Sequence, residues 1–182
     1  MNLPNKLTMA RIIMIPAFMA AMLKNFFLAA LIIFCVAAIT DFFDGYLARK
    51  HNLVSSFGKI MDPMADKLLV FSALMCFIQM GITAVWAPII IIAREFFVTS
   101  MRVVAVSKGK VIAASWWGKI KTNVQLFTLI GAMLLLVLTG FDVIPLKNAY
   151  FWTDILIWVS AIFTIASWIA YIFENISVFK DE

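Results

Sequence analysis

Six apolar stretches follow one another along the chain, and each is close to the ~20 residues that a membrane-spanning helix requires. They cover residues 8–24, 26–49, 62–81, 84–106, 120–140 and 151–174. Polar or helix-breaking residues separate several of them, at 24–25, at Gly81 and at 140–150, where Pro145 lies. The pattern predicts six helices joined by short connections.

The composition supports helices that cross a membrane. Hydrophobic residues make up 64% of the 182 positions, whereas a soluble domain is ~45–50% apolar. One small core cannot hide that much apolar surface from water. We therefore predict an all-α membrane protein, a single domain over residues 1–182 that folds as a bundle of six transmembrane helices. We expect the N-terminal segment to be retained, because no small-residue cleavage site follows the apolar run at 12–23.

Basic residues gather on one side of the predicted bundle. The net charge is +5, and an even number of spans brings both termini to the same side. Because positively charged loops stay in the cytoplasm, we predict that both termini and the connections between spans 2 and 3 and spans 4 and 5 are cytoplasmic, in the cell membrane. That side holds 13 of the 15 basic residues: Lys6, Arg11, Arg49, Lys50, Lys59, Lys67, Arg94, Arg102, Lys108, Lys110, Lys119, Lys121 and Lys180.

This charge bears on the partners of the protein. Basic helix ends attract anionic lipid of the bilayer and substrates that carry phosphate. Nucleic acid is not an expected partner, because the basic residues lie at helix ends rather than on a soluble face.

Four aspartates interrupt the apolar pattern within 26 residues. Asp41 and Asp44 lie three positions apart on one face of the second helix, and Asp62 and Asp66 lie four apart on one face of the third. The short connection makes these two helices antiparallel neighbours, so their cytoplasmic ends bring the four carboxylates together. An ionised side chain costs at least ~2.5–3.5 kcal/mol in the middle of a membrane helix, so the cluster requires a strong reason.

Bound metal is the interpretation that we favour. Clustered bare carboxylates repel one another or take up protons, whereas two divalent cations neutralise four negative charges. Oxygen ligands favour Mg²⁺ or Mn²⁺ over zinc, and paired ions of this kind serve phosphoryl chemistry. Each aspartate alone has a simpler reading: Asp62 before Pro63 fits a helix N-cap, and Asp41 fits the end of a span with Arg49 as its solvated partner.

The stretch resembles the signature of the CDP-alcohol phosphatidyltransferases, D-x2-D-G-x2-A-R-x8-G-x3-D-x3-D. Every fixed position is matched: Asp41, Asp44, Gly45, Ala48, Arg49, Gly58, Asp62 and Asp66. The resemblance implies two Mg²⁺ or Mn²⁺ ions on Asp41, Asp44 and Asp62 with Asp66 beside them, and Asp66 as general base. It also implies a homodimer and a CDP site formed by Asn5, Thr8, Asp41, Gly45, Arg49 and Ser55.

Two further stretches resemble the branch of this family that uses glycerol 3-phosphate as acceptor. One is Asn5-Lys-Leu-Thr-Met-Ala-Arg11 with Pro16, and the other comprises Ala93-Arg-Glu-Phe96, Arg102 and Gly118-Lys-Ile-Lys-Thr122. The implied reaction moves the phosphatidyl group from CDP-diacylglycerol to glycerol 3-phosphate and releases CMP. The implied ligands of the acceptor phosphate are Arg94, Arg102, Lys119 and Lys121. Snorkelling at the membrane surface is the alternative reading of these cations, and Glu95 is expected either to orient an arginine or to meet substrate.

Two other functions fit part of the pattern. A relative with another acceptor, such as inositol phosphate, serine or phosphatidylglycerol, would share the whole signature. A divalent-cation transporter would also need intramembrane carboxylates. Against the transporter, the aspartates lie at one membrane face rather than at its middle, and Arg49 and Arg94 would repel a passing cation.

Overall fold

The computed structural model describes residues 3–50, 56–107, 109 and 116–175, with backbone only for 3–6, 41–50, 56–60 and 62–63. This part of the chain forms helices and no strand, which confirms the all-helical prediction. The six helices are α1 (Leu3–Leu23), α2 (Phe27–Lys50), α3 (Ser56–Gln79), α4 (Trp86–Ser107), α5 (Trp116–Thr139) and α6 (Leu146–Glu174).

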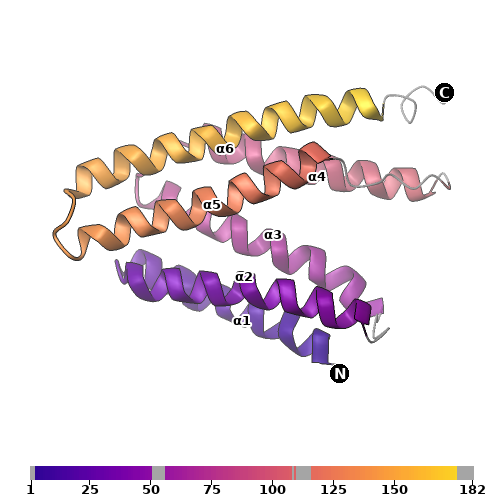
Figure 1. Cartoon of the computed structure of the whole chain (residues 1–182), viewed down its shortest axis with the longest axis horizontal. Helices are drawn as coiled ribbons and strands as arrows, with labels where there is room; N and C mark the ends of the chain where they lie inside the picture. The colour runs from indigo at the N-terminus through magenta and orange to yellow at the C-terminus, as the bar shows by residue number, and fades with distance from the viewer. Residues whose placement is uncertain (1–2, 51–55, 108, 110–115, 176–182) are drawn as a thin grey trace.

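The helices run back and forth along the long axis of the molecule. In Figure 1, α1 begins and α6 ends at the right-hand end, where α2 ends and α3 begins. The tight turns after α1 and α5 lie at the opposite end. Residues in the left-handed region reverse the chain: Asn25 at φ 60°, Gly81 at φ +69° and Asp142 at φ 56°. Glycine, asparagine and aspartate adopt this conformation more readily than other residues.

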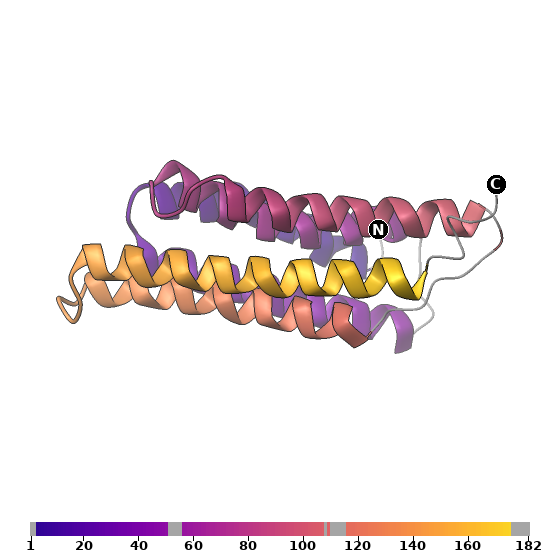
Figure 2. The same cartoon turned by 90° about the horizontal axis from the view of Figure 1, so that it is seen from above.

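The six helices form two layers of three. α1, α3 and α4 make one layer and α2, α5 and α6 the other, and α1–α2 and α4–α6 contacts join the layers at either side. Figure 2 shows α4 (pink) above α6 (yellow). The middle helices, α3 and α5, contact their neighbours but barely contact each other. Residues of α3 and α5 line the two cavities that are described below.

A continuous apolar core fills the rest of the space between the layers. Phe18 and Phe34 are fully buried, and their ring centroids are 5.6 Å apart. Phe77, Leu136 and Ile157 bring α3, α5 and α6 into the same core. This core contains residues of all six helices and so joins them into one bundle.

Four helices begin earlier than the apolar pattern predicts. α3 begins at Ser56 rather than 62, α1 at Leu3 rather than 8, α6 at Leu146 rather than 151 and α5 at Trp116 rather than 120. The first turn of each contains a lysine, which interrupts the apolar pattern and resembles a loop in sequence. The N-cap reading of Asp62 is wrong, since a cap stands at the start of a helix and Asp62 lies well inside α3.

Within the described residues, two helices, α5 and α6, are long and apolar enough to cross a membrane. The apolar parts of α1 and α2 are shorter, covering Leu7–Leu23 and Phe27–Thr40. The remaining part of α2 and the helices α3 and α4 carry many of the charged residues of the sequence motifs, and others lie in the first turns of α1 and α5.

Candidate active site

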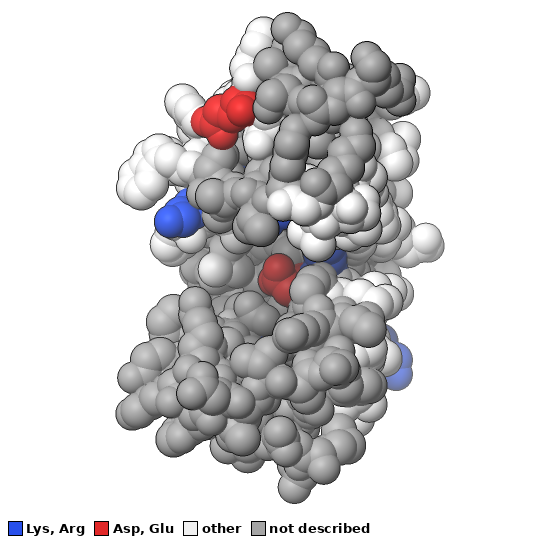
Figure 3. Space-filling view, turned by 90° about the vertical axis from the view of Figure 1, so that its right-hand side faces the viewer, with Lys and Arg blue, Asp and Glu red and all other residues white. Residues whose placement is uncertain are grey.

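A cavity of about 870 Å³ opens between α3, α4 and α5 toward the right-hand end of the bundle. We call it the outer cavity. In Figure 3, which faces that end, acidic and basic atoms lie in a hollow near its centre. Six charged residues line the outer cavity: Asp66, Lys67, Arg94, Glu95, Arg102 and Lys119.

One face of α4 supplies most of this wall. Arg94, Val98, Arg102 and Val106 follow one another at intervals of four residues, and all four line the outer cavity. Side chains four apart lie above one another on a helix. The spacing of the two arginines, which the sequence already displays, therefore places both on the cavity side of α4.

Glu95 joins two buried cations. Its Oε1 accepts hydrogen bonds from Arg94 Nη1 at 3.0 Å and from Lys121 Nζ at 2.5 Å. The side chains of Arg94 and Lys121 are only 7% and 3% exposed. Buried charges need paired partners, because leaving water is costly. Glu95 thus contacts an arginine, as one of the two sequence-based alternatives expected.

Arg94 has a second partner on α6, a helix that is distant in sequence but packs against α4. Its Nη2 donates a hydrogen bond of 2.8 Å to Ser167 Oγ of α6. The Nε of Arg94 is buried and has no hydrogen-bond partner among the described residues. The guanidinium is therefore held at both terminal nitrogens and still has donors to offer.

Lys67 is a cavity residue that the sequence analysis assigned no role. Its Nζ donates to Thr99 Oγ1, and that hydroxyl in turn donates to the backbone oxygen of Glu95 at 2.8 Å. These contacts tie α3 to α4 beside Asp66. Adjacency to Asp66 was the only sequence signal, and it does not by itself tell whether a side chain faces the cavity.

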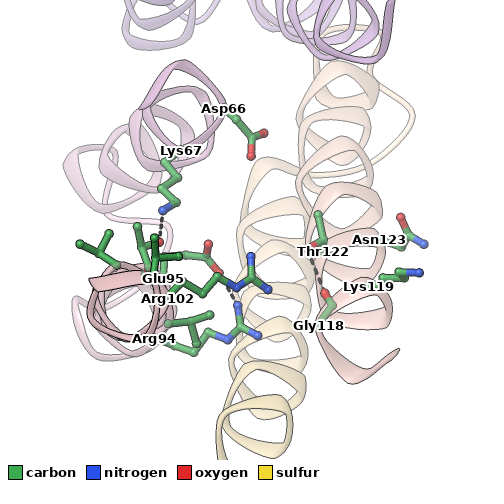
Figure 4. Close-up of a pocket in the computed structure, with 13 residues that line it drawn as sticks. Asp66, Lys67, Arg94, Glu95, Arg102, Gly118, Lys119, Thr122 and Asn123 are labelled. Carbon is green, nitrogen blue, oxygen red and sulfur yellow. Dashed lines mark hydrogen bonds and ion pairs between the residues drawn. The ribbon is translucent and has the colours of Figure 1, made fainter. Parts of the chain in front are cut away.

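Figure 4 shows how the charged side chains lie. Asp66 points from α3 into the space before α5, and the guanidinium groups of Arg94 and Arg102 extend from α4 toward the same space. Thr122 faces them from α5, whereas Lys119 extends away from the arginines. A carboxylate therefore stands across an open space from two permanent cations.

A second, inner cavity of about 160 Å³ reaches into the bundle. Asp66, Lys67 and Glu95 line both cavities, so they stand where the two adjoin. Arg11 of α1, which is fully buried, and Lys121 and Gln125 of α5 line the inner one. Lys121 is thus placed apart from the other predicted phosphate ligands.

Comparisons with known proteins show which family the chain belongs to. A sequence model of the CDP-alcohol phosphatidyltransferase family matches residues 1–166. The chain belongs to this family. It is 42% identical to the CDP-diacylglycerol–glycerol-3-phosphate 3-phosphatidyltransferase of Bacillus subtilis (strain 168), over 98% of this chain and 97% of the relative. A protein of the same name from Rickettsia felis is 39% identical over 93% of each chain.

A third relative is more partial. The probable phosphatidylglycerophosphate synthase of Mycobacterium tuberculosis is 42% identical, over 68% of this chain and 62% of its own length. The family that the signature residues predicted is confirmed by these matches.

The structure describes only part of the CDP-alcohol phosphatidyltransferase signature. Asp66 is described in full, and Thr8 is buried on α1. Ser55 lies outside the described residues, as do the side chains of Asn5, Asp41, Asp44, Arg49 and Asp62, and Gly45 is described by its backbone. Among the described side chains, no group of three acidic, histidine or cysteine residues is close enough to hold a metal ion.

The backbone is nevertheless informative about the metal. The end of α2 and the beginning of α3, which carry the four aspartates, lie at the same end of the bundle. Their donor set is oxygen alone, and oxygen ligands suit Mg²⁺ or Mn²⁺. The residues present therefore fit a divalent-cation site near the outer cavity.

Proposed function

We propose that this protein transfers the phosphatidyl group from CDP-diacylglycerol to glycerol 3-phosphate, giving phosphatidylglycerophosphate and CMP. The observation that carries the proposal is Asp66 facing Arg94 and Arg102 across the outer cavity. The relatives with 39–42% identity over nearly the whole chain bear names that state this donor and this acceptor.

The protein would act within a bilayer, as a bundle of six spans. Large apolar side chains are exposed on helices around the whole bundle, including Ile13, Ile32, Ile89, Phe127 and Ile162. Apolar surface of this extent marks contact with another apolar medium. The active site would face the cytoplasm, because nearly all basic residues belong to that end. The expected location is the cell membrane.

Two Mg²⁺ or Mn²⁺ ions would be held by Asp41, Asp44 and Asp62, with Asp66 beside them. When bound, the ions would orient the pyrophosphate of the donor and stabilise the negative charge of the departing CMP. The CDP group would be held by Asn5, Thr8, Gly45, Arg49 and Ser55. Asp41 would bind the metal ions and also contact the CDP group.

The outer cavity would receive glycerol 3-phosphate. Its dianionic phosphate suits Arg94 and Arg102, which are permanent cations with several donors each. Nη1 and Nη2 of Arg94 each donate one hydrogen bond within the protein, to Glu95 and Ser167, and each carries a second hydrogen that can be donated to the phosphate. Lys119 would add positive charge at the rim of the cavity. Lys121 would act on the phosphate indirectly, because it binds Glu95 and Glu95 in turn binds Arg94.

Asp66 would act as general base. It lines both cavities, so it can meet an acceptor from one side and a donor from the other. It would take the proton of the 1-hydroxyl of glycerol 3-phosphate. The oxygen then forms a bond to the phosphorus that carries diacylglycerol, while the bond from that phosphorus to CMP breaks and CMP leaves with the electron pair.

An acceptor panel tests this function. Purified protein with Mg²⁺ and CDP-diacylglycerol should release CMP in the presence of glycerol 3-phosphate and form a phosphorylated lipid. Inositol phosphate, serine and phosphatidylglycerol, each offered alone, should release far less. CMP release with one of these and none with glycerol 3-phosphate would overturn the acceptor assignment while keeping the family chemistry.

Two measurements address the metal and the rival function. A chelator should stop CMP release, and added Mg²⁺ or Mn²⁺ should restore it; turnover that persists in the chelator would refute the two-ion site. Uptake of divalent cation into proteoliposomes without lipid substrate would instead support the transporter. The family resemblance also implies a homodimer. Light scattering by the purified protein in detergent would measure its mass and so test this.

A further inference from the structure

Helix α6 packs against α4 next to Arg94. Val98, Met101 and Ala105 of α4 form a buried cluster with Tyr171 of α6. Phe97 and Trp168 pack beside it in a tilted arrangement, with ring centroids 5.3 Å apart. On α6 these contacts involve Trp168 and Tyr171, which follow Ser167 within about one helical turn. The last turns of α6 are therefore fixed relative to the helix that carries the arginines.

Ser167 is the contact that fixes the guanidinium of Arg94 to another helix. Its Oγ accepts from Arg94 Nη2 at 2.8 Å, across 73 positions of sequence. The other described partner, Glu95, is the next residue on α4 itself. Ser167 is only 1% exposed, so water does not compete for this hydrogen bond.

We propose that Ser167 is a positioning residue for the acceptor phosphate, acting through Arg94. The inference rests on the proposed function, because it assigns the ligand of Arg94. An arginine side chain has many rotamers, and holding it in one of them before substrate arrives removes an entropic cost of binding. Bidentate recognition of phosphate also depends on the direction of the guanidinium plane. By accepting one hydrogen bond, the Oγ of Ser167 holds Arg94 in one rotamer and also sets the direction of its guanidinium plane.

The family match does not supply this residue. It ends at residue 166, and Ser167 follows it. The assignment therefore comes from the packing of α6 on α4 and from the hydrogen bond itself.

α6 also contains a matched control. Ser160 is on the same buried face, two turns earlier, and is likewise 1% exposed. Its Oγ has no hydrogen-bond partner among the described residues. Ser160→Ala thus removes the same atom at the same burial on the same helix, but away from Arg94.

The test compares Michaelis constants for the two substrates in the full-length protein. Ser167→Ala should raise KM for glycerol 3-phosphate by about tenfold, the lower range for a hydrogen bond to a charged group. KM for CDP-diacylglycerol should change less than about twofold, as should both constants in Ser160→Ala. If the alanine variant does not fold, Ser167→Cys takes its place in the test. Cysteine nearly keeps the volume of the side chain but accepts hydrogen bonds weakly, so KM for glycerol 3-phosphate should rise in the same way.

A double-mutant cycle separates positioning from general support of the fold. In the Arg94→Gln background, Ser167→Ala should add no further increase in KM for glycerol 3-phosphate, since the group it positions is gone. An equal increase in both backgrounds, or an unchanged KM in Ser167→Ala, would overturn the inference. Failure of the wild-type protein to release CMP with glycerol 3-phosphate is a different result, which would refute the proposed function itself.

Discussion

The two ends of the bundle each enclose a cavity, but different side chains surround them. At the right-hand end of Figure 1, the outer cavity of about 870 Å³ is lined by four basic and two acidic residues. At the opposite end, a cavity of about 380 Å³ lies between the turns after α1 and α5. Its lining is one polar residue, Asn25, with Phe26, Phe27, Leu28, Ala29, Val137, Gly140 and Phe141.

The difference shows that organised charge, rather than hollow space, marks the candidate site. At the polar end, Glu95 binds two buried cations and Ser167 holds Arg94 from a distant helix. At the apolar end, the turns are closed by backbone hydrogen bonds, such as Phe26 N to Ala21 O at 2.9 Å. Such bonds satisfy the backbone itself, and none of the residues that line this cavity is charged.

The largest expected effect comes from removing the carboxylate at the junction of the two cavities. Asp66→Asn keeps the shape of the side chain but cannot accept the proton of the hydroxyl. General-base catalysis is worth ~10²–10⁴-fold, so CMP release should fall by about that factor. The variant should remain in the membrane fraction with an unchanged unfolding temperature. Near-normal turnover would rule out Asp66 as the base.

The next effect concerns the buried arginine. Arg94→Gln removes the charge opposite the acceptor phosphate, and hydrogen bonds of a charged group are worth ~1.5–3 kcal/mol each. We expect KM for glycerol 3-phosphate to rise about 10–100-fold and KM for CDP-diacylglycerol to change little. A rise in both constants would mean that Arg94 supports the site as a whole rather than the acceptor alone.

A smaller effect distinguishes two lysines on one helix turn. Lys121 is 3% exposed and bound to Glu95, whereas Lys119 is exposed and extends away from the arginines. Lys121→Met should lower kcat/KM about tenfold and lower the unfolding temperature, because it breaks a buried ion pair. Lys119→Met should cost less than about fivefold and leave stability unchanged, as exposed charges do. Equal effects would contradict this division of roles.

The sequence was most informative where spacing is local. The four aspartates, Gly45 and Arg49 predicted the family, which the family model and the relatives confirm. Six helices and their turns at Asn25 and Gly81 also followed from local pattern. The six membrane spans, the bound metals and the orientation stay predictions.

Long-range contacts could not be predicted. Nothing near Arg94 in sequence indicates Ser167, and nothing near Lys67 indicates that Thr99 accepts its hydrogen bond. Lys119 and Lys121 were given one role because both belong to the basic stretch that resembles the glycerol-3-phosphate branch of the family. Residues two positions apart point to different sides of a helix, and the layer packing decides which side meets Glu95.

The smallest expected effect belongs to the apolar end, and it challenges the comparison most directly. Phe141 lines the cavity there and is largely exposed, so Phe141→Ala removes a large side chain without opening the core. Exposed substitutions of this kind stay within ~0.5 kcal/mol, and kcat/KM for both substrates should remain within about twofold of wild type. The change lies at the far end of α5 from Lys121, so loss of activity without loss of stability would mean that the apolar cavity takes part in catalysis. Unchanged kcat/KM values in Phe141→Ala would instead agree with chemistry at the other end of the bundle, where charged residues line the outer cavity.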